Sequence, residues 1–384
     1  MNVMSKNNIF ISRTRRTPVG EWWRSVDQIQ LGLLIILIGT GLVLSMAASP
    51  AATTRLDYGN PFFFLYRHAI FAALGLIGAI FISFLGPNWA RRFAVVTLFG
   101  AIVLMAALPF IGYEVKGAVR WLRLGSFSLQ PSEFAKPAFV VFAAWMFSVR
   151  KRDPNVPSVA IVFTIFFLLI GLLITQPDFG QSFLITLGFA AVFFFAGLSL
   201  GWLLFMMGVS ILGVVAAYLA LPHVRARIAA FKSPDSADSY QTDKALEAIA
   251  NGGFLGRGPG EGAVKYSLPD GHTDFIFAVT VEEFGFLISV VLIVLLATFI
   301  FRAFRNALQL NDYFSQLAVA GLATLIGMQM VINLFVNLNM APSKGMTLPF
   351  ISYGGSSLLS LCFTAGLILA FTAKRPGAYG YGAN

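Results

Sequence analysis

Long apolar stretches separated by short polar segments dominate the chain. Each stretch has about 17 residues or more with few charges, close to the length that an α-helix needs to cross a bilayer. The pattern predicts an all-α polytopic integral membrane protein with about ten transmembrane helices. The predicted spans are 28–48, 68–86, 93–112, 132–149, 157–175, 182–198, 201–221, 274–301, 313–338 and 354–373.

The polar segments between the spans indicate the orientation. With ten spans both termini lie on the same side, and the two tails and the short loops on that side together carry the whole net charge of +10. Because short cytoplasmic loops are rich in Lys and Arg, we place both termini in the cytoplasm. The prediction is a cytoplasmic tail at 1–27, a membrane domain at 28–373 and a cytoplasmic tail at 374–384. A large periplasmic loop, 222–273, connects the seventh and eighth spans.

The composition narrows the function classes. Apolar residues make up 57% of the 384 residues and charged residues 11%, whereas about a quarter of a soluble protein is charged. The basic balance follows from the topology, so we infer no nucleic-acid partner. The single cysteine, Cys362, excludes an intrachain disulfide and a cysteine metal site.

The large loop has structure of its own. Residues 239–251 have the pattern of a short amphipathic helix, which Gly252 and Gly253 would end. The glycine-rich segment 252–262 lacks the strand and helix that flank a nucleotide-binding loop. It is either a flexible turn or a lid that approaches a substrate.

The outer segment before the fourth span carries a group of charged residues. Gln130 is a weak helix cap, and Glu133 and Lys136, three residues apart, share a helix face. One interpretation is an internal Glu–Lys pair that locks two helices. The other is an anion site built from Arg120, Arg123 and Lys136, because arginine and a helix N-terminus both favour phosphate oxygens.

Two further outer segments add polar groups. Asp178 lies in the turn Gln-Pro-Asp-Phe-Gly-Gln, which is either a plain turn or part of a site. Before the last span, prolines and glycines break the helix at membrane depth, where such backbone must be buried or line a cavity. Lys344, Ser352 and Ser356 are expected to supply donors to that cavity. Tight packing of small residues is the alternative.

The most informative segment runs from the large loop into the eighth span. His272 or Thr273 is expected to cap this helix, which leaves Asp274 in its first turn. The helix dipole stabilises a carboxylate anion there. Asp274 is then ready to accept a proton from an alcohol, unless it serves only as a structural cap.

Two more carboxylates, Glu282 and Glu283, follow deeper in the same span. Charge at bilayer depth is costly unless it is paired. We therefore expect a buried partner for them, such as Lys136 or Lys344.

At these segments the chain closely resembles the SEDS family (shape, elongation, division and sporulation) over nearly its whole length. The shared motifs are Arg-Trp…Gln-Pro-Ser-Glu-Phe-Ala-Lys, Asp-Phe-Gly-Gln, Leu-Pro-x-x-His-Thr-Asp-Phe and Lys-Gly-x-x-Leu-Pro-x-x-Ser-Tyr-Gly-Gly-Ser-Ser. The resemblance implies an inner-membrane peptidoglycan glycosyltransferase that polymerises lipid II with a class B penicillin-binding protein and other divisome membrane proteins. The family's essential aspartate falls on Asp274, and its Glu and Lys fall on Glu133 and Lys136. Lys344 followed by glycine is typical of the division branch, which implies a role at the septum.

The residues and the resemblance together give one mechanistic hypothesis. Asp274 would act as general base on the 4-hydroxyl of the acceptor GlcNAc, and undecaprenyl pyrophosphate would leave the donor. Arg120, Lys136 and Lys344 would hold the diphosphate, with a divalent cation, Mg²⁺ or Mn²⁺, as a further bridge and no organic cofactor. The alternatives are a lipid II flippase, a scaffold for the penicillin-binding protein, or an elongation-type polymerase of the same family.

Overall fold

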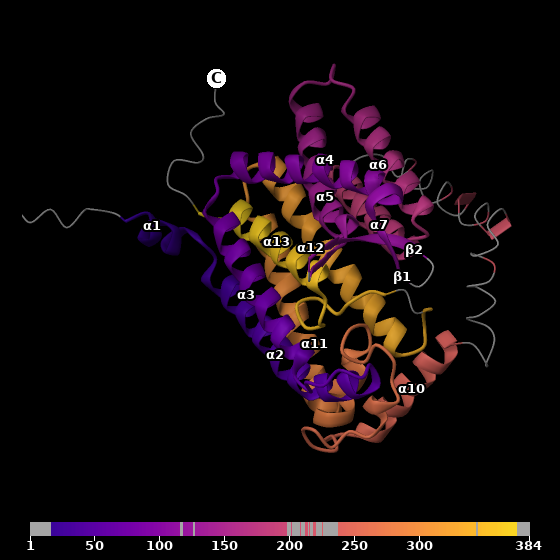
Figure 1. Cartoon of the computed structure of the whole chain (residues 1–384). Helices are drawn as coiled ribbons and strands as arrows, with labels where there is room; N and C mark the ends of the chain where they lie inside the picture. Colours follow the sequence, from indigo (N-terminus) through magenta and orange to yellow (C-terminus); the bar gives the residue numbers. More distant parts are fainter. Residues whose placement is uncertain are drawn as a thin grey trace, which may run out of the picture.

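The computed structural model describes residues 17–115, 118–125, 127–197, 237–342 and 345–374, together with isolated positions between 201 and 225. These residues form a helical bundle with one small sheet (Figure 1). The helices are α1 (Pro18–Ser25), α2 (Gln28–Arg55), α3 (Phe63–Phe84), α4 (Pro87–Ile111), α5 (Pro131–Arg152), α6 (Ser158–Thr175), α7 (Phe179–Phe195), α10 (Ala237–Gly252), α11 (Ile276–Leu308), α12 (Tyr313–Asn337) and α13 (Gly355–Thr372), with a 3₁₀ turn η1 (Val264–Tyr266).

Seven of the described helices are long and apolar enough to cross a membrane, namely α2, α3, α4, α6, α11, α12 and α13. The helix α5 and the 17-residue α7 pack with them. The predicted helical membrane class is confirmed, and each of these helices overlaps a predicted span. The predicted span 201–221 lies outside the continuously described residues. The count of ten, the periplasmic side of loop 222–273 and the cytoplasmic tails 1–27 and 374–384 therefore remain predictions.

Aspartate side chains cap the N-termini of two membrane helices, α2 and α12, on the side that the sequence assigns to the cytoplasm. Asp27 accepts a hydrogen bond from the Gln30 amide at the start of α2 (3.0 Å), and Asp312 caps α12 in the same way. Asp27 also forms an ion pair with Arg302 of α11 (2.9 Å). Burial acts to raise the pKa of Asp27, but the hydrogen bonds from Arg302 and Gln30 outweigh it, so the pKa is lowered. This ion pair fixes α2 to α11 at one boundary of the bundle.

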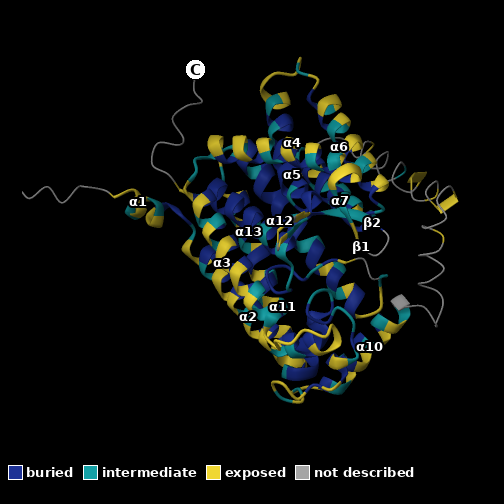
Figure 2. Ribbon diagram, in the orientation of Figure 1, coloured by how far each residue is buried: buried dark blue, intermediate teal, exposed yellow. Residues whose placement is uncertain are grey.

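The centre of the bundle is formed by α5, α12 and α13, whose residues are mostly buried (Figure 2). Small residues bring neighbouring helices close together. A Cβ built on Gly75 of α3 would lie 2.7 Å from the Cys362 sulfur of α13, and one on Gly366 would lie 2.9 Å from the Ala79 backbone. Transmembrane helices gain packing energy from such close approach, because lipid gives no hydrophobic force between them.

A small sheet, which the sequence pattern does not predict, precedes α5. Strands β1 (Tyr113–Val115), β2 (Ala118–Leu124) and β3 (Phe127–Leu129) pair antiparallel in the order β1-β2-β3. Gly125, with a φ of 62°, permits the tight turn between the last two strands. Two of these strands have only three residues each, which is too short for an alternating pattern to indicate a strand.

Helix α10 confirms the amphipathic helix predicted at 239–251 and ends at Gly252 as expected. The glycine-rich segment that follows is not a free turn. Residues 253–258 pack against α11, which is broken at Gly285. In Figure 1, α10 lies at the end of the bundle opposite α1, so this loop builds the face that the sequence assigns to the periplasm.

Candidate active site

Two polar regions lie in the half of the bundle that faces α10 and the sheet. The first, the α5–α7 network, consists of Arg120, Gln130, Glu133, Lys136, Asp178 and Gln181. The second, the Asp274 seam, is the contact between the turn 270–275 and the segment 345–353. They contain most of the residues that the sequence singled out.

Buried side chains of the α5–α7 network bond mainly to one another. Lys136 forms an ion pair with one Glu133 oxygen (2.8 Å), and Gln181 donates to the other (2.6 Å). Gln130 donates to the Asp178 carboxylate (3.0 Å). The side chains of Lys136 and Glu133 are only 3% and 6% exposed. An internal Glu–Lys pair, one of the two interpretations of this spacing, thus describes the observed contact.

Arg120 enters the same network from β2. Its guanidinium donates to the carbonyls of Gln176 (2.8 Å) and Pro177 (2.5 Å) and lies 3.8 Å from the Asp178 carboxylate. Burial raises the pKa of Asp178, and the charge of Arg120 acts against that rise. Arg123 is exposed further along β2. Two cations thus face two carboxylates in this network, and the expected three-cation anion site does not assemble here.

The start of α13 joins the network to the rest of the site. Ser356 accepts a hydrogen bond from the Gln130 amide (3.0 Å) and donates to the Ser128 carbonyl (2.8 Å). Ser352 accepts a hydrogen bond from the Leu348 amide (2.8 Å). Both serines were expected to face a substrate cavity, and both instead hold backbone segments in place.

Asp274 lies half-buried in the turn that precedes α11. The prediction that His272 or Thr273 caps this helix is wrong, because α11 begins at Ile276 with Phe275 in the cap position. The Thr273 hydroxyl donates instead to a carbonyl within its own turn (3.0 Å). Asp274 therefore stands just before the helix and not in its first turn.

Two asparagines of α12, which sequence reasoning missed, hold this turn in place. Asn337 accepts a hydrogen bond from the Ala278 amide (3.1 Å) and so caps α11 from a neighbouring helix. The side-chain amides of Asn333 and Asn337 both donate to the Asp274 carbonyl (2.8 and 3.0 Å). Asn333 also donates to the Met346 carbonyl (2.6 Å). The two sides of the seam are thus tied to the same buried side chain.

The irregular segment 345–353 lies at membrane depth, as the sequence predicted. A Cβ built on Gly41 of α2 would lie 2.8 Å from the carbonyl oxygens of both Phe350 and Ile351. Gly41 follows Asp27 by 14 residues, a rise of about 21 Å at 1.5 Å per residue. That height is inside a hydrocarbon core about 30 Å thick.

The same segment approaches the Asp274 carboxylate. A Cβ built on Gly345 would lie 3.8 Å from Asp274 Oδ2. At the other end of the segment, the Tyr353 amide donates to the His272 carbonyl (3.1 Å). Both ends of the segment 345–353 therefore contact the turn 270–275. Lys344 lies outside the described residues.

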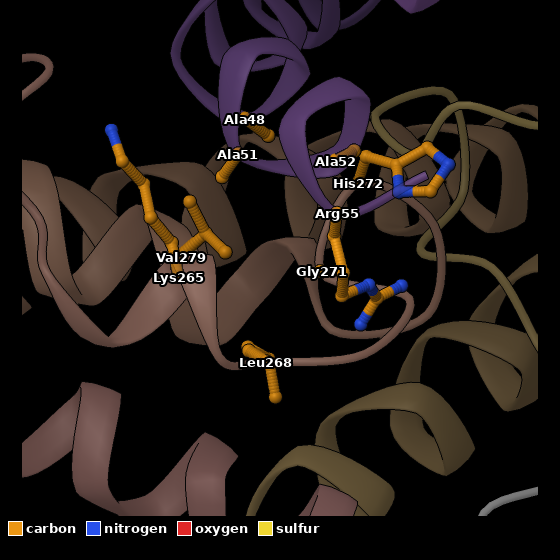
Figure 3. Close-up of a pocket in the computed structure, with 9 residues that line it drawn as sticks. All are labelled: Ala48, Ala51, Ala52, Arg55, Lys265, Leu268, Gly271, His272 and Val279. Atoms are coloured by element: carbon orange, nitrogen blue, oxygen red, sulfur yellow. The ribbon is translucent and has the colours of Figure 1, made fainter. Parts of the chain in front are cut away.

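His272 is a buried residue of the seam and lies between the rings of Phe64 (centroids 4.3 Å apart) and Tyr353 (5.6 Å). Burial lowers the pKa of His272 to about 4, so the ring is neutral at neutral pH. Figure 3 shows it lining a small cavity, with Arg55 nearby and Lys265 on the far side. The cavity volume of about 10 Å³ holds no more than about one water molecule, which is too small for a sugar.

The two glutamates of α11 are buried against η1, which corrects their expected partners. Lys265 forms an ion pair with Glu283. Glu282 accepts hydrogen bonds from two backbone amides of η1 (2.7 and 3.0 Å). Lys136 is paired elsewhere, with Glu133. The large loop folds back onto α11, and this return brings its lysine to carboxylates that lie later in the chain.

A metal site made by protein ligands alone is not found in the described part of the chain, where no three His, Cys, Asp or Glu side chains lie close enough together. A cation at Asp274 would therefore need further ligands from a substrate, such as diphosphate oxygens. The expectation of Mg²⁺ or Mn²⁺ stays a proposal.

Known proteins share this architecture. A family model described as Cell cycle protein, which groups FtsW, RodA and SpoVE, matches residues 28–376. The chain belongs to this family. It is 48% identical over 369 residues to a probable peptidoglycan glycosyltransferase FtsW of Caulobacter vibrioides, covering 96% of this chain and 95% of that protein. A probable peptidoglycan glycosyltransferase FtsW of Trichlorobacter lovleyi is 34% identical over 357 residues, covering 90% of this chain and 93% of that protein.

Solved structures agree with the sequence relatives. One matching chain belongs to a solved structure described as "Structural coordination of polymerization and crosslinking by a peptidoglycan synthase complex". It matches with a TM-score of 0.75 at 28% identity, covering 91% of this chain and 98% of that one. The rod shape determining protein RodA of Thermus thermophilus matches with a TM-score of 0.68 at 28% identity, covering 92% and 98%. The resemblance to the SEDS family is confirmed, and the protein is a multi-pass membrane protein.

Proposed function

We propose that this protein is a peptidoglycan glycosyltransferase that polymerises lipid II at the division septum of the bacterial inner membrane. Relatives described as probable peptidoglycan glycosyltransferases FtsW support both the activity and the division role. The observation that carries the mechanism is the Asp274 seam. There, two buried asparagines fix the backbone of a half-buried carboxylate.

Asp274 acts as the general base in this proposal. Its carboxylate takes the proton from the 4-hydroxyl of the acceptor GlcNAc, whose oxygen forms a bond to the anomeric carbon of the donor MurNAc. The bond between that carbon and the diphosphate breaks, and undecaprenyl pyrophosphate leaves with inversion at the anomeric carbon. A positioned base of this kind contributes about 10²–10⁴-fold in rate.

The cations near the site divide into two roles. The charges of Arg120 and Lys136 are balanced by Asp178 and Glu133, so we assign these two cations to the positioning of α5 and α7. Direct contact with the diphosphate then falls to Arg123 and Lys344. We also propose that a Mg²⁺ or Mn²⁺ ion neutralises the diphosphate, which predicts that EDTA stops polymerisation and that added cation restores it.

An apolar groove between the helices is evidence in favour of a lipid-linked substrate. It has a volume of about 340 Å³ and lies among α3, α4, α5 and α13. The lining residues are Leu74, Gly75, Gly78, Ile82, Phe93, Thr97, Phe134, Leu359 and Phe363. A nearly uninterrupted apolar lining suits an isoprenoid chain, and the groove gives that chain a lateral place between helices.

The proposed partner is a class B penicillin-binding protein, because one structural neighbour belongs to a peptidoglycan synthase complex. The test uses both purified proteins in liposomes with lipid II, Mg²⁺ or Mn²⁺, and penicillin to block crosslinking. Glycan strands from the wild type and none from Asp274→Ala are the expected result. Transfer of labelled lipid II across the bilayer without glycan would identify a flippase. Neither activity, under conditions in which a control polymerase works, would identify a scaffold.

A further inference from the structure

The helix α11 is broken at Gly285, where φ is 82° and ψ is 170°. In an unbroken helix, the carbonyls of Glu282 and Glu283 would accept hydrogen bonds from the amides of Phe286 and Leu287. The break separates these pairs, so four backbone groups lose their helical partners. Unpaired backbone groups are not tolerated in lipid.

Residues 253–258, at the end of α10, supply partners for all four groups. The amides of Arg257 and Gly258 donate to the carbonyls of Glu282 (2.9 Å) and Glu283 (3.0 Å), respectively. In the other direction, the amides of Phe286 and Leu287 donate to the carbonyls of Gly253 (2.9 Å) and Phe254 (3.4 Å). The loop segment is therefore part of the helix backbone structure, although it is distant in sequence.

Glycines make this contact possible. A Cβ built on Gly285 would lie 2.4 Å from the Phe254 carbonyl oxygen, and one on Gly256 would lie 2.2 Å from the Glu283 carbonyl oxygen. Both glycines also have positive φ angles, which other residues rarely adopt. The segment is thus held against α11 in one register.

The break lies at the depth of the outer leaflet. Arg302 of α11 pairs with Asp27 at the cytoplasmic boundary, and Gly285 precedes Arg302 by 17 residues, a rise of about 26 Å. A hydrocarbon core about 30 Å thick extends beyond that height. The exposed side chains of α11 next to the break are apolar, as lipid contact requires, and they are Phe286, Leu287, Ile288, Val291 and Val294.

The tip of the docked segment continues this apolar face. Phe254 and Leu255 are 74% and 80% exposed, and the ring of Phe254 lies 6.4 Å from that of Phe286. Arg257 follows, exposed and with its Nε bonded to the Asn251 carbonyl (2.8 Å). Two apolar side chains followed by an arginine match the boundary between acyl chains and phosphate groups.

We propose that the tip Phe254–Leu255 is inserted into the outer leaflet and contacts the acyl chains of bulk lipid. Lipid is the occupant because the tip is continuous with the lipid-facing side of α11, and α11 already binds the carbonyl of Phe254. The insertion fixes the large loop, which also carries Lys265. The ion pair between Lys265 and Glu283 joins this loop to α11, the helix that follows Asp274. This membrane contact does not depend on the proposed glycosyl transfer.

The test is spin labelling of the full-length protein in liposomes. The variants carry Cys362→Ala together with one of three changes: Leu255→Cys, Ile288→Cys as a lipid-exposed control, or Asp243→Cys as an exposed control on α10. Each label is then challenged with oxygen, which concentrates in lipid, and with a nickel chelate that stays in water. The Leu255 label is expected to resemble the Ile288 label, with high oxygen access and low nickel access.

Two results would overturn the proposal. Nickel access equal to that at Asp243 would place the tip in water. Low access to both reagents would show that another part of the protein covers the tip. Labelling at Phe254 repeats the measurement at a second position, and size-exclusion elution of each labelled variant confirms that it is folded.

Discussion

The two polar regions of the outer half are built in opposite ways. In the α5–α7 network, the buried Lys136 and the half-buried Arg120 form ion pairs with Glu133 and Asp178, so the charges balance. In the Asp274 seam, the buried side chains of Asn333 and Asn337 bond to backbone carbonyls, while the carboxylate of Asp274 stays half-exposed. A closed set of charges stabilises the packing of helices, whereas a carboxylate on a fixed backbone is suited to chemistry. The presence of charge near the membrane surface does not distinguish the two regions, whereas the bonds of their buried side chains do: these run to other side chains in the network and to backbone groups in the seam.

The largest effect is expected from Asp274→Asn, which keeps the carbonyl that both asparagines bind. Polymerisation should fall by about 10²–10⁴-fold, because the base is lost, while thermal unfolding stays as in the wild type. The matched control is Asp270→Asn in the same turn, where φ is 53° and asparagine is well tolerated. Equal loss of glycan in both variants would mean that the turn as a whole, and not the Asp274 carboxylate, is required.

The next effect should come from Lys136→Met, which leaves Glu133 as a buried charge without its ion pair. We expect the free energy of unfolding to fall by about 3–5 kcal/mol. Adding Glu133→Gln should restore most of it, since no uncompensated charge remains. Thermal unfolding in detergent measures both. A double variant that is as stable as the wild type yet makes no glycan would show that Lys136 contacts substrate, and the two regions would then share one role.

A smaller effect concerns His272 and pH. Its pKa is about 4 in the folded protein against 6.5 for an ordinary histidine, so the folded state binds the proton less readily. The stability from the neutral ring is complete above pH 6.5 and is lost as pH falls toward 4, by about 3 kcal/mol. The free energies of unfolding of the wild type and of His272→Gln, measured across this pH range, should converge as pH falls. Parallel curves would contradict the assignment.

The smallest effect is expected from Asn333→Ala. Two carbonyls lose a donor, so unfolding should become easier by about 1–3 kcal/mol, and kcat should fall by about tenfold as the Asp274 turn shifts. Gln329→Ala is the control, because Gln329 donates in the same manner to the Thr347 carbonyl (3.1 Å). Both variants should lose stability, and only Asn333→Ala should lose kcat. A loss of kcat in both would remove the distinction.

The membrane fold could be predicted from the sequence because apolar length alone decides whether a helix spans a bilayer. The same holds for features set by local spacing, such as the helix α10 and the pairing of Glu133 with Lys136. The polar stripe of α12 could also have been recognised in the sequence, because Gln329, Asn333 and Asn337 recur every four residues within an apolar helix.

Contacts between distant segments could not be predicted, because they depend on which helices become neighbours. Asn337 caps α11 from a position 59 residues away from the amide it binds. Lys265 reaches Glu283 only because the large loop returns to α11. Arg120 donates to carbonyls of a turn that lies more than 50 residues later. The sequence favoured other partners in these cases: a local cap at His272 or Thr273 for α11, and Lys136 or Lys344 for the two glutamates.

The segment 345–353 rests against Gly41 in the first membrane helix, and the Lys374 amide donates to the Ser25 carbonyl (2.8 Å). The first membrane helix and the segment 345–353 thus form one wall of the site. A ribosome needs roughly 15 to 60 s to add the roughly 300 residues between those two parts. A nascent chain that ends before residue 345 lacks this wall, so the site can assemble only after the segment 345–353 has been synthesised.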